Sequence, residues 1–144
     1  GRTYELTHFL VDVLGITDLH ISGRGRVAYH ASCHGLRGLG IKTQPHHLFN
    51  NIEGVEPTEL PDGEACCGFG GLFAVKMGDI SGTILARKLE NIEASGAETI
   101  VGTDVSCLMN IAGRARRMGV DIEVRHVVEL LAGDLDEPAI GEGR

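Results

Sequence analysis

The second half of the chain alternates short apolar segments with amphipathic ones, and this order constrains the fold more than any other feature. Residues 98–102 and 121–125 have the composition of buried strands. Residues 81–95 and 104–118 carry apolar side chains at the spacing of helices. With a further strand expected over residues 26–30, the alternation favours a parallel sheet joined by right-handed crossovers. The sequence therefore predicts an α/β fold, a Rossmann-like parallel sheet of three to four strands flanked by helices.

Local signals mark the ends of the predicted helices. Ser81 is placed to cap the start of the longer helix, and Gly96 is placed to end it. Residues 3–14 have apolar side chains at helical spacing and are expected to bury one face. Residues 45–51 indicate a short helix, and residues 53–62 indicate an acidic, proline-bearing connection.

Composition and charge narrow the class of protein and its partners. The 144 residues are 42% apolar and 23% charged, as expected of one globular domain with a continuous core. The net charge of -7 disfavours a nucleic-acid backbone as partner. No apolar run approaches the roughly 20 residues of a membrane span, and the start lacks the order of a signal peptide. We therefore expect a cytoplasmic protein with no membrane span.

The two ends of the chain suggest its domain organisation. The chain opens on glycine in place of methionine and soon enters an amphipathic segment, so we interpret residues 1–132 as one domain, the C-terminal half of a longer protein. Residues 133–144 are glycine-rich and acidic, with few large apolar side chains. Such a composition predicts a flexible acidic tail.

The four cysteines are the residues with the most distinctive chemistry. They are too sparse for a disulfide framework, and a domain of this length does not need one. Each follows a predicted strand or lies in a glycine-rich loop, so a parallel sheet could gather them at one edge. Thiolates suit zinc and iron–sulphur clusters. The predicted metal ligands are Cys33, Cys66, Cys67 and Cys107. A single cysteine is as often a small buried hydrophobic residue, but an adjacent pair is harder to explain in that way.

Other residues near the cysteines could complete a site. Gly68 and Gly70 would let the backbone approach a bound group and donate N–H groups to it. Asp104 precedes Cys107 by three residues, so both would face one side of a helical turn. Asp104, His30 and His34 are secondary ligand candidates. Taken singly, each histidine is more often a hydrogen-bonded structural residue or a surface residue than a ligand.

The spacing of these residues resembles a known motif. Between Cys33 and the pair Cys66-Cys67, which Gly68 follows, lie 32 residues, and 36 more lie between Cys67 and the segment Asp104-x-x-Cys107. This pattern resembles the CCG, or cysteine-rich, domain family, whose usual motif is one cysteine, an adjacent pair and a final Cys-x-x-Cys. Over residues 27–132 it is similar to the C-terminal CCG domain of lactate-utilization and glycolate oxidase iron–sulphur proteins, which are related to the CCG-bearing component of heterodisulfide reductase.

The resemblance implies a function. It implies an iron–sulphur cluster, of the 4Fe–4S type, held by the four cysteines with Gly68 and Gly70 beside it. The domain would be a non-catalytic, electron-transfer part of an oxidoreductase system for lactate, glycolate or a related 2-hydroxy acid. Its partners would be other subunits of that system, iron–sulphur or flavin proteins.

One departure from the motif leaves alternatives open. Asp104 stands where the family has the first cysteine of its final pair, which removes a thiolate. A smaller cluster, carboxylate ligation or zinc then remain open, because a carboxylate is a harder ligand than a thiolate. Two other functions also remain: a structural zinc module for subunit assembly, and a thiol redox domain in which Cys66 and Cys67 form a strained vicinal disulfide.

Overall fold

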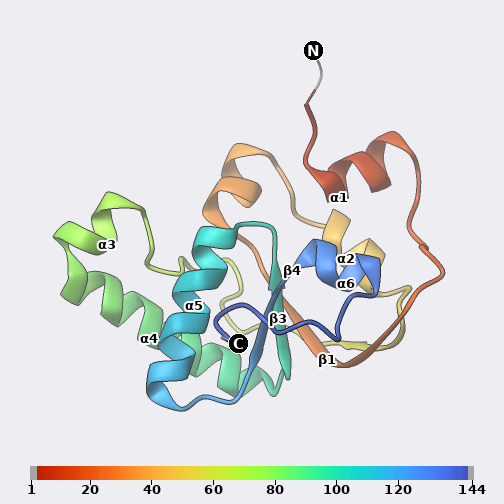
Figure 1. Ribbon diagram of the computed structural model, residues 1–144. Helices are drawn as coiled ribbons and strands as arrows, with labels where there is room; N and C mark the ends of the chain where they lie inside the picture. Colours follow the sequence, from red (N-terminus) through yellow and green to blue (C-terminus); the bar gives the residue numbers. More distant parts are fainter. Residues whose placement is uncertain (1–2, 143–144) are drawn as a thin grey trace.

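A four-stranded parallel sheet forms the centre of the molecule, for which a computed structural model describes residues 3–142 (Figure 1). The strand order is β2-β1-β3-β4, and every neighbouring pair is parallel. The strands are β1 (Ser22–His30), β2 (Glu53–Pro57), β3 (Thr99–Gly102) and β4 (Glu123–His126). This confirms the predicted α/β class and the flanked parallel sheet.

Helical segments cover both faces of the sheet. They are α1 (Leu6–His8), α2 (Gln44–Phe49), α3 (Leu72–Lys76), α4 (Gly78–Ser95), α5 (Val105–Met118), α6 (Val127–Ala132) and the π-helical turns η1 (Phe9–Val13) and η2 (His34–Gly38). Ala28 and Ile100 face the core beneath α4 and α5, whereas Val27 and Val101 face the core beneath α2 and α6. Among residues 3–142, no helix is long and apolar enough to cross a membrane.

The strand order creates a topological switch point at the carboxyl ends of β1 and β3. β1 lies between β2 and β3, so the chain leaves β1 to one side and, after β2, returns on the other through α3 and α4. His30 at the end of β1 is paired with Gly102 at the end of β3. The segments that follow these two strands therefore start side by side. In open α/β sheets, ligands bind at such a switch point outside the carboxyl ends of the strands.

Two local predictions in this region are wrong. The segment predicted as a connection contains β2, which is an exposed edge strand with Pro57 at its end and so lacks an apolar run. Ser81 does not cap α4, which begins at Gly78. It is buried, and its hydroxyl donates to the carbonyl of Gly68 at 2.6 Å. The predicted end of α4 at Gly96, with φ of +69°, is confirmed.

The N-terminal segment buries less apolar surface than its spacing predicts. It forms α1 and η1 and lies beside α2, away from the sheet (Figure 1). Leu10 and Val11 pack against the core, but Leu6, Phe9 and Val13 are exposed. The predicted apolar stripe is therefore only partly buried, because this segment packs against α2 and not against the face of the sheet.

The segment after α6 packs against β4 as far as it is described. The guanidinium of Arg125 donates to the carbonyls of Leu135 and Glu137 at 3.1 and 2.9 Å. Ala139 is buried, and the N–H of Ile140 donates to the carbonyl of Val124 at 2.9 Å. Residues 143–144 of the predicted tail, like residues 1–2, lie outside the described residues. The flexibility of this tail in solution stays a prediction.

Candidate metal centre

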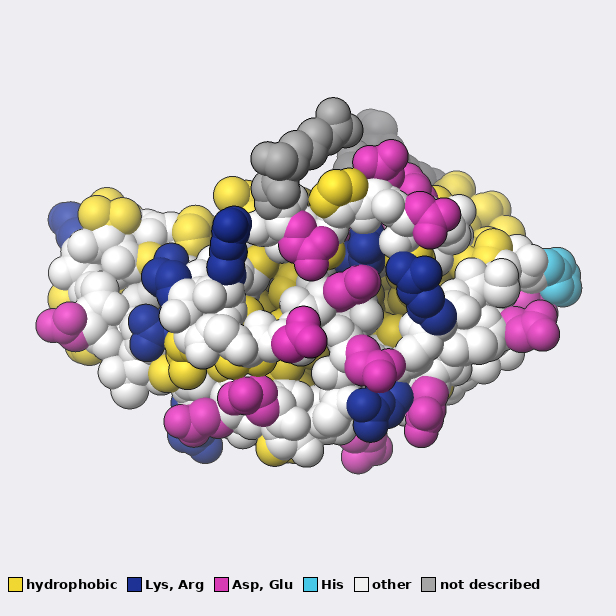
Figure 2. Space-filling model, turned by 60° about the horizontal axis from the view of Figure 1, so that its bottom comes forward, with side chains coloured by type: hydrophobic (Ala, Val, Ile, Leu, Met, Phe, Trp, Pro, Cys, Tyr) yellow, Lys and Arg dark blue, Asp and Glu magenta, His cyan; other side chains and the backbone are white. Residues whose placement is uncertain are grey.

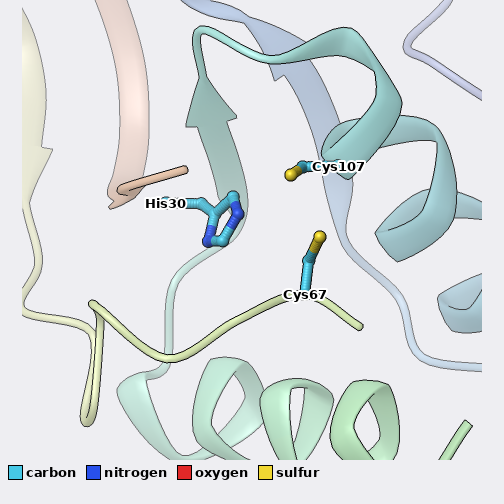
Figure 3. Close-up of side chains that lie close together, drawn as sticks. All are labelled: His30, Cys67 and Cys107. Carbon is cyan, nitrogen blue, oxygen red and sulfur yellow. The ribbon is translucent and has the colours of Figure 1, made fainter. Parts of the chain in front are cut away.

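Three potential metal ligands meet at the carboxyl edge of the sheet. His30 is the last residue of β1, Cys67 lies in the loop before α3, and Cys107 lies in the first turn of α5. Their ligand atoms all lie within 4.8 Å of one another, and the two sulphurs point toward each other beside the imidazole (Figure 3). Two atoms bound to one zinc ion lie at most about 4.6 Å apart, since each bond is about 2.0–2.3 Å long. The three side chains are therefore close to the spacing that a shared ion requires.

His30 has an unusual environment. It is 1% exposed, and neither ring nitrogen has a hydrogen-bond partner among residues 3–142. Buried polar atoms are normally paired, so an unpaired imidazole beside two thiols fits a group that binds a metal. This histidine is therefore not a surface residue, and its role as a ligand stays a prediction.

Hydrogen bonding between Cys67 and Cys107 shifts their pKa values in opposite directions. The Cys107 thiol donates to Cys67, which lowers the pKa of Cys67, and His30 and the N–H of Phe69 also favour its thiolate. The same hydrogen bond raises the pKa of Cys107, because it keeps the proton next to the Cys67 sulphur. Cys67 is buried, and its thiolate is the negative charge of the pair. A charged sulphur at this depth is ready to bind a cation.

Cys66 and Cys33 extend the cluster toward the surface. Partial removal from water raises the pKa of Cys66, and the nearby Cys33 raises it further through charge and hydrogen bonding. The N–H of Gly68 donates to the Cys66 sulphur at 3.3 Å. Cys33 is half-buried at the start of η2. The structure thus brings all four free thiols to one edge of the sheet, and their role as ligands stays a prediction.

Glycine at position 68 is required by the close approach of α4. Gly68 has a φ of +81°, and a Cβ there would lie 2.6 Å from the carbonyl oxygen of Ser81. Gly70 also has a positive φ, of +51°. The N–H groups of Gly68 and Phe69 point at the sulphurs of Cys66 and Cys67. The N–H groups of this loop therefore donate hydrogen bonds to the cysteine sulphurs, which are the atoms that would bind a cluster.

The other secondary candidates lie differently. Asp104 caps α5, and its Oδ1 accepts a hydrogen bond from the N–H of Cys107 at 3.1 Å. Its charge also contributes to the raised pKa of Cys107. His34 is exposed in η2, and the group of metal-capable side chains found in the described part of the chain includes neither residue.

Replacing Asp104 tests its capping role. Asp104→Ala is expected to destabilise the chain by about 1 kcal/mol, because the N–H of Cys107 loses its acceptor. Asp104→Asn retains an acceptor and is expected to stay within about 0.5 kcal/mol of the original chain. Urea unfolding measures both. Equal losses from the two variants would contradict the capping role.

Two residues that the sequence did not single out hold the cysteine loop. The side-chain amide of Asn110 on α5 donates to the carbonyl of Cys67 at 3.0 Å. Lys88 on α4 is buried and donates to carbonyls just before Cys66. Helical spacing places Lys88 between Leu85 and Ile92 on the buried face, and this signal in the sequence could have revealed it.

The opposite edge of the sheet has a different character. Figure 2 shows this face, where acidic side chains are spread among basic ones around a hollow. A depression of about 740 Å³ lies there, lined in part by Arg26, Glu98 and Glu123 at the amino ends of the strands. Arg26 and Glu98 form an exposed ion pair at 3.4 Å. None of the cysteines lines this depression.

The fold and the site together define a class of protein. A doubly wound α/β domain places His30, Cys67 and Cys107 close together at the switch point of its sheet, with Cys33 and Cys66 nearby, and thiols and imidazoles are donor types that suit a metal centre. Residues 27–112 match the cysteine-rich domain of the CCG family. The chain belongs to this family.

Similar proteins cover nearly the whole chain. Lactate utilization protein A of Oceanobacillus iheyensis is 48% identical over 131 residues, which cover 91% of this chain and 54% of that protein. The protein of the same name from Macrococcus caseolyticus is 50% identical over 135 residues, which cover 94% of this chain and 55% of that protein. The chain therefore spans about half the length of the curated relatives it matches.

Proposed function

We propose that this domain holds an iron–sulphur cluster and transfers electrons in a system that oxidises lactate or a related 2-hydroxy acid. The observation that carries the proposal is the meeting of Cys67 and Cys107 with the unpaired His30, next to Cys66 and Cys33. The names of the relatives support lactate as the substrate of the system. The domain would be its non-catalytic part.

The residues of the site have separate tasks in this proposal. A bound cluster supplies one-electron transfer. Cys33, Cys66, Cys67 and Cys107 would hold it, with His30 as a further donor. The N–H groups of the glycine-rich loop donate to two of these sulphurs, and such hydrogen bonds raise the reduction potential of a cluster. Burial of Cys67 keeps water from the inner side of the site.

A structural zinc ion is the second candidate. One nitrogen and two sulphurs within 4.8 Å of one another match the mixed donor set of closed zinc sites, and Cys66 or Cys33 could supply the fourth ligand. Zinc would stabilise the fold for subunit assembly and carry no electrons. The third candidate, a redox-active vicinal disulfide, would involve only Cys66 and Cys67.

Anaerobic reconstitution distinguishes the three candidates. The chain would be incubated with iron and sulphide, and both would then be quantified alongside the EPR spectrum of the reduced protein. Stoichiometric iron and sulphide with a cluster signal are the expected result. Stoichiometric zinc that resists exchange by iron would favour the structural module. A mass change of two hydrogens on reduction, without bound metal, would favour the disulfide.

The proposed partners are other iron–sulphur or flavin subunits of the same system. α3 follows the cysteine loop and projects from the body of the molecule (Figure 1). Its side chains Leu72 and Val75 are 64% and 81% exposed. Apolar side chains exposed together often mark a contact with another protein, and electrons need a short path into the site. This observation supports docking of a redox partner beside α3.

Metal affinity is expected to rise with pH. The pKa values of Cys66 and Cys107 are raised, so both thiols keep their protons near neutral pH and must release them to bind a metal. Cys67, whose pKa is lowered, is already ionised and adds no further dependence. At least two protons are therefore released on binding, and the Kd for cobalt(II) is expected to fall at least about 100-fold for each unit by which the pH rises below those pKa values.

Cobalt(II) titrations at about pH 6.5 and about pH 7.5 measure this dependence. Cys66→Ser removes one of these protons, so the change in its affinity over the same interval is expected to be about tenfold smaller than that of the original chain. An affinity of the original chain that is independent of pH would contradict the assigned protonation.

A further inference from the structure

Lys88 is a buried charged residue outside the predicted ligand set. Its side chain is 1% exposed and lies on the inner face of α4, near Leu85 and Leu89. Lysine is almost never fully buried without partners, because its charge loses hydration. Its position therefore calls for groups that replace water.

Those groups are backbone carbonyls of the turn that leads to the cysteine pair. The ammonium Nζ donates to the carbonyls of Gly63 at 2.8 Å, Ala65 at 3.2 Å and Asp62 at 3.5 Å. An ammonium group has three donors, so these contacts match its full capacity. The carboxylate of Asp62 lies at the surface, where Oδ2 is 3.6 Å from Nη2 of Arg87. Lys88 thus ties α4 to the main chain directly before Cys66.

The charge of Lys88 also acts on the site. Burial lowers its pKa, whereas Asp62 and then the thiols of Cys67, Cys107 and Cys33 favour its charged form. By the same attraction, a positive charge inside the domain favours thiolates at those positions. In the described part of the chain, no carboxylate forms an ion pair with Lys88 within 4.0 Å, so carboxylate pairing does not neutralise this charge.

We propose that Lys88 is a positioning residue for the metal centre: its ammonium group fixes the turn before Cys66 and Cys67, and its charge offsets that of the bound thiolates. The inference rests on the proposed metal site but adds a residue that binds no metal. Lys88 thus has two effects. It makes the cysteine loop rigid in the metal-free chain, and it increases the affinity for the metal and influences how the thiolates coordinate it.

Lys88→Met tests the proposal, because methionine fills similar space without charge or donors. Cobalt(II) alone serves as the probe, and its absorption reports the number of bound thiolates. We expect affinity for cobalt(II) to fall at least about tenfold and the spectrum at saturation to change, as for other residues that orient ligands. In the metal-free chain, amide exchange at residues 62–68 is expected to accelerate at least about tenfold.

Arg87→Ala is the matched control, because Arg87 neighbours Lys88 and contacts the same turn from the surface. Its affinity and exchange rates are expected to stay within about threefold of those of the original chain. Lys88→Gln, which keeps donors but not the charge, provides a second variant if methionine prevents folding. It is expected to restore much of the exchange protection and little of the affinity.

The outcomes separate this proposal from the metal site itself. If the original chain binds neither cobalt(II) nor iron, the proposed function fails, whereas amide exchange still decides whether Lys88 holds the loop. If Lys88→Met and Lys88→Gln bind cobalt(II) with unchanged affinity and spectrum, the positioning role is overturned. A uniform loss of stability with an unchanged spectrum would likewise assign Lys88 to the core alone.

Discussion

Cys67→Ser is expected to lower the affinity of the chain for cobalt(II) or iron at least about 100-fold. Cys67 is 2% exposed and lies beside His30. The hydrogen bond with Cys107 lowers the pKa of Cys67, so Cys67 carries the negative charge of the pair. A serine hydroxyl is a poor ligand at neutral pH, because it does not ionise. Loss of a residue that only orients a ligand costs about 10–100-fold in affinity, so loss of a buried ligand is expected to cost more. Metal titration with cobalt(II), followed by iron and sulphide analysis after reconstitution, measures the effect.

Ala115→Ser supplies the control for this variant. Ala115 is buried in the same core on α5, about two helical turns after Cys107 and away from the carboxyl edge, so the new hydroxyl tests burial of a polar group without touching the site. Its affinity for metal is expected to match that of the original chain. If Cys67→Ser retained the original affinity and folded normally, Cys67 would not be a ligand.

Gly68→Ala is expected to destabilise the chain by about 3 kcal/mol. The backbone at Gly68 has a φ of +81°, and the new Cβ would meet the carbonyl oxygen of Ser81 at 2.6 Å. That oxygen belongs to the main chain of α4, so it cannot rotate away. The loop would have to move outward, and the hydrogen bond from the Ser81 hydroxyl to Gly68 would break. Urea unfolding of the metal-free chain measures the loss.

Gly119→Ala is the matched comparison. Gly119 ends α5 in the left-handed conformation, with φ of +71°, and a Cβ there would meet nothing within 4 Å. Only the conformational penalty remains, about 1–2 kcal/mol. Equal destabilisation by the two alanines would show that the contact between the loop and α4 is unimportant.

The parallel sheet was predictable because its central strands carry their own signal. β3 is fully buried, and the helices beside it show regular apolar spacing. β2 was missed because an exposed edge strand gains its stability from pairing with β1, which the local sequence does not reveal. α6 was missed because it follows β4 without a break, and His126 serves both as the last residue of the strand and as the cap of the helix.

The candidate site was predictable in outline and not in detail. Cysteines placed after parallel strands were expected to converge, and the structure brings all four to one edge of the sheet. The importance of His30 depends on the absence of a partner within the described residues, which is a property of three-dimensional packing. The role of Lys88 depends on a turn more than twenty residues earlier, so local spacing could indicate its burial but not its contacts.

The two outer strands differ in how they would resist growth of the sheet by addition of a foreign strand. On one side, β2 ends at Pro57, whose nitrogen cannot donate, and exposes Glu53 and Glu56 to repel an approaching acidic chain. On the other side, the main chain at Ile140 already occupies a carbonyl of β4. The edge strand β2 is therefore protected by its own residues, and the edge strand β4 by the segment that follows α6. Removal of that segment would leave β4 as a template for aggregation.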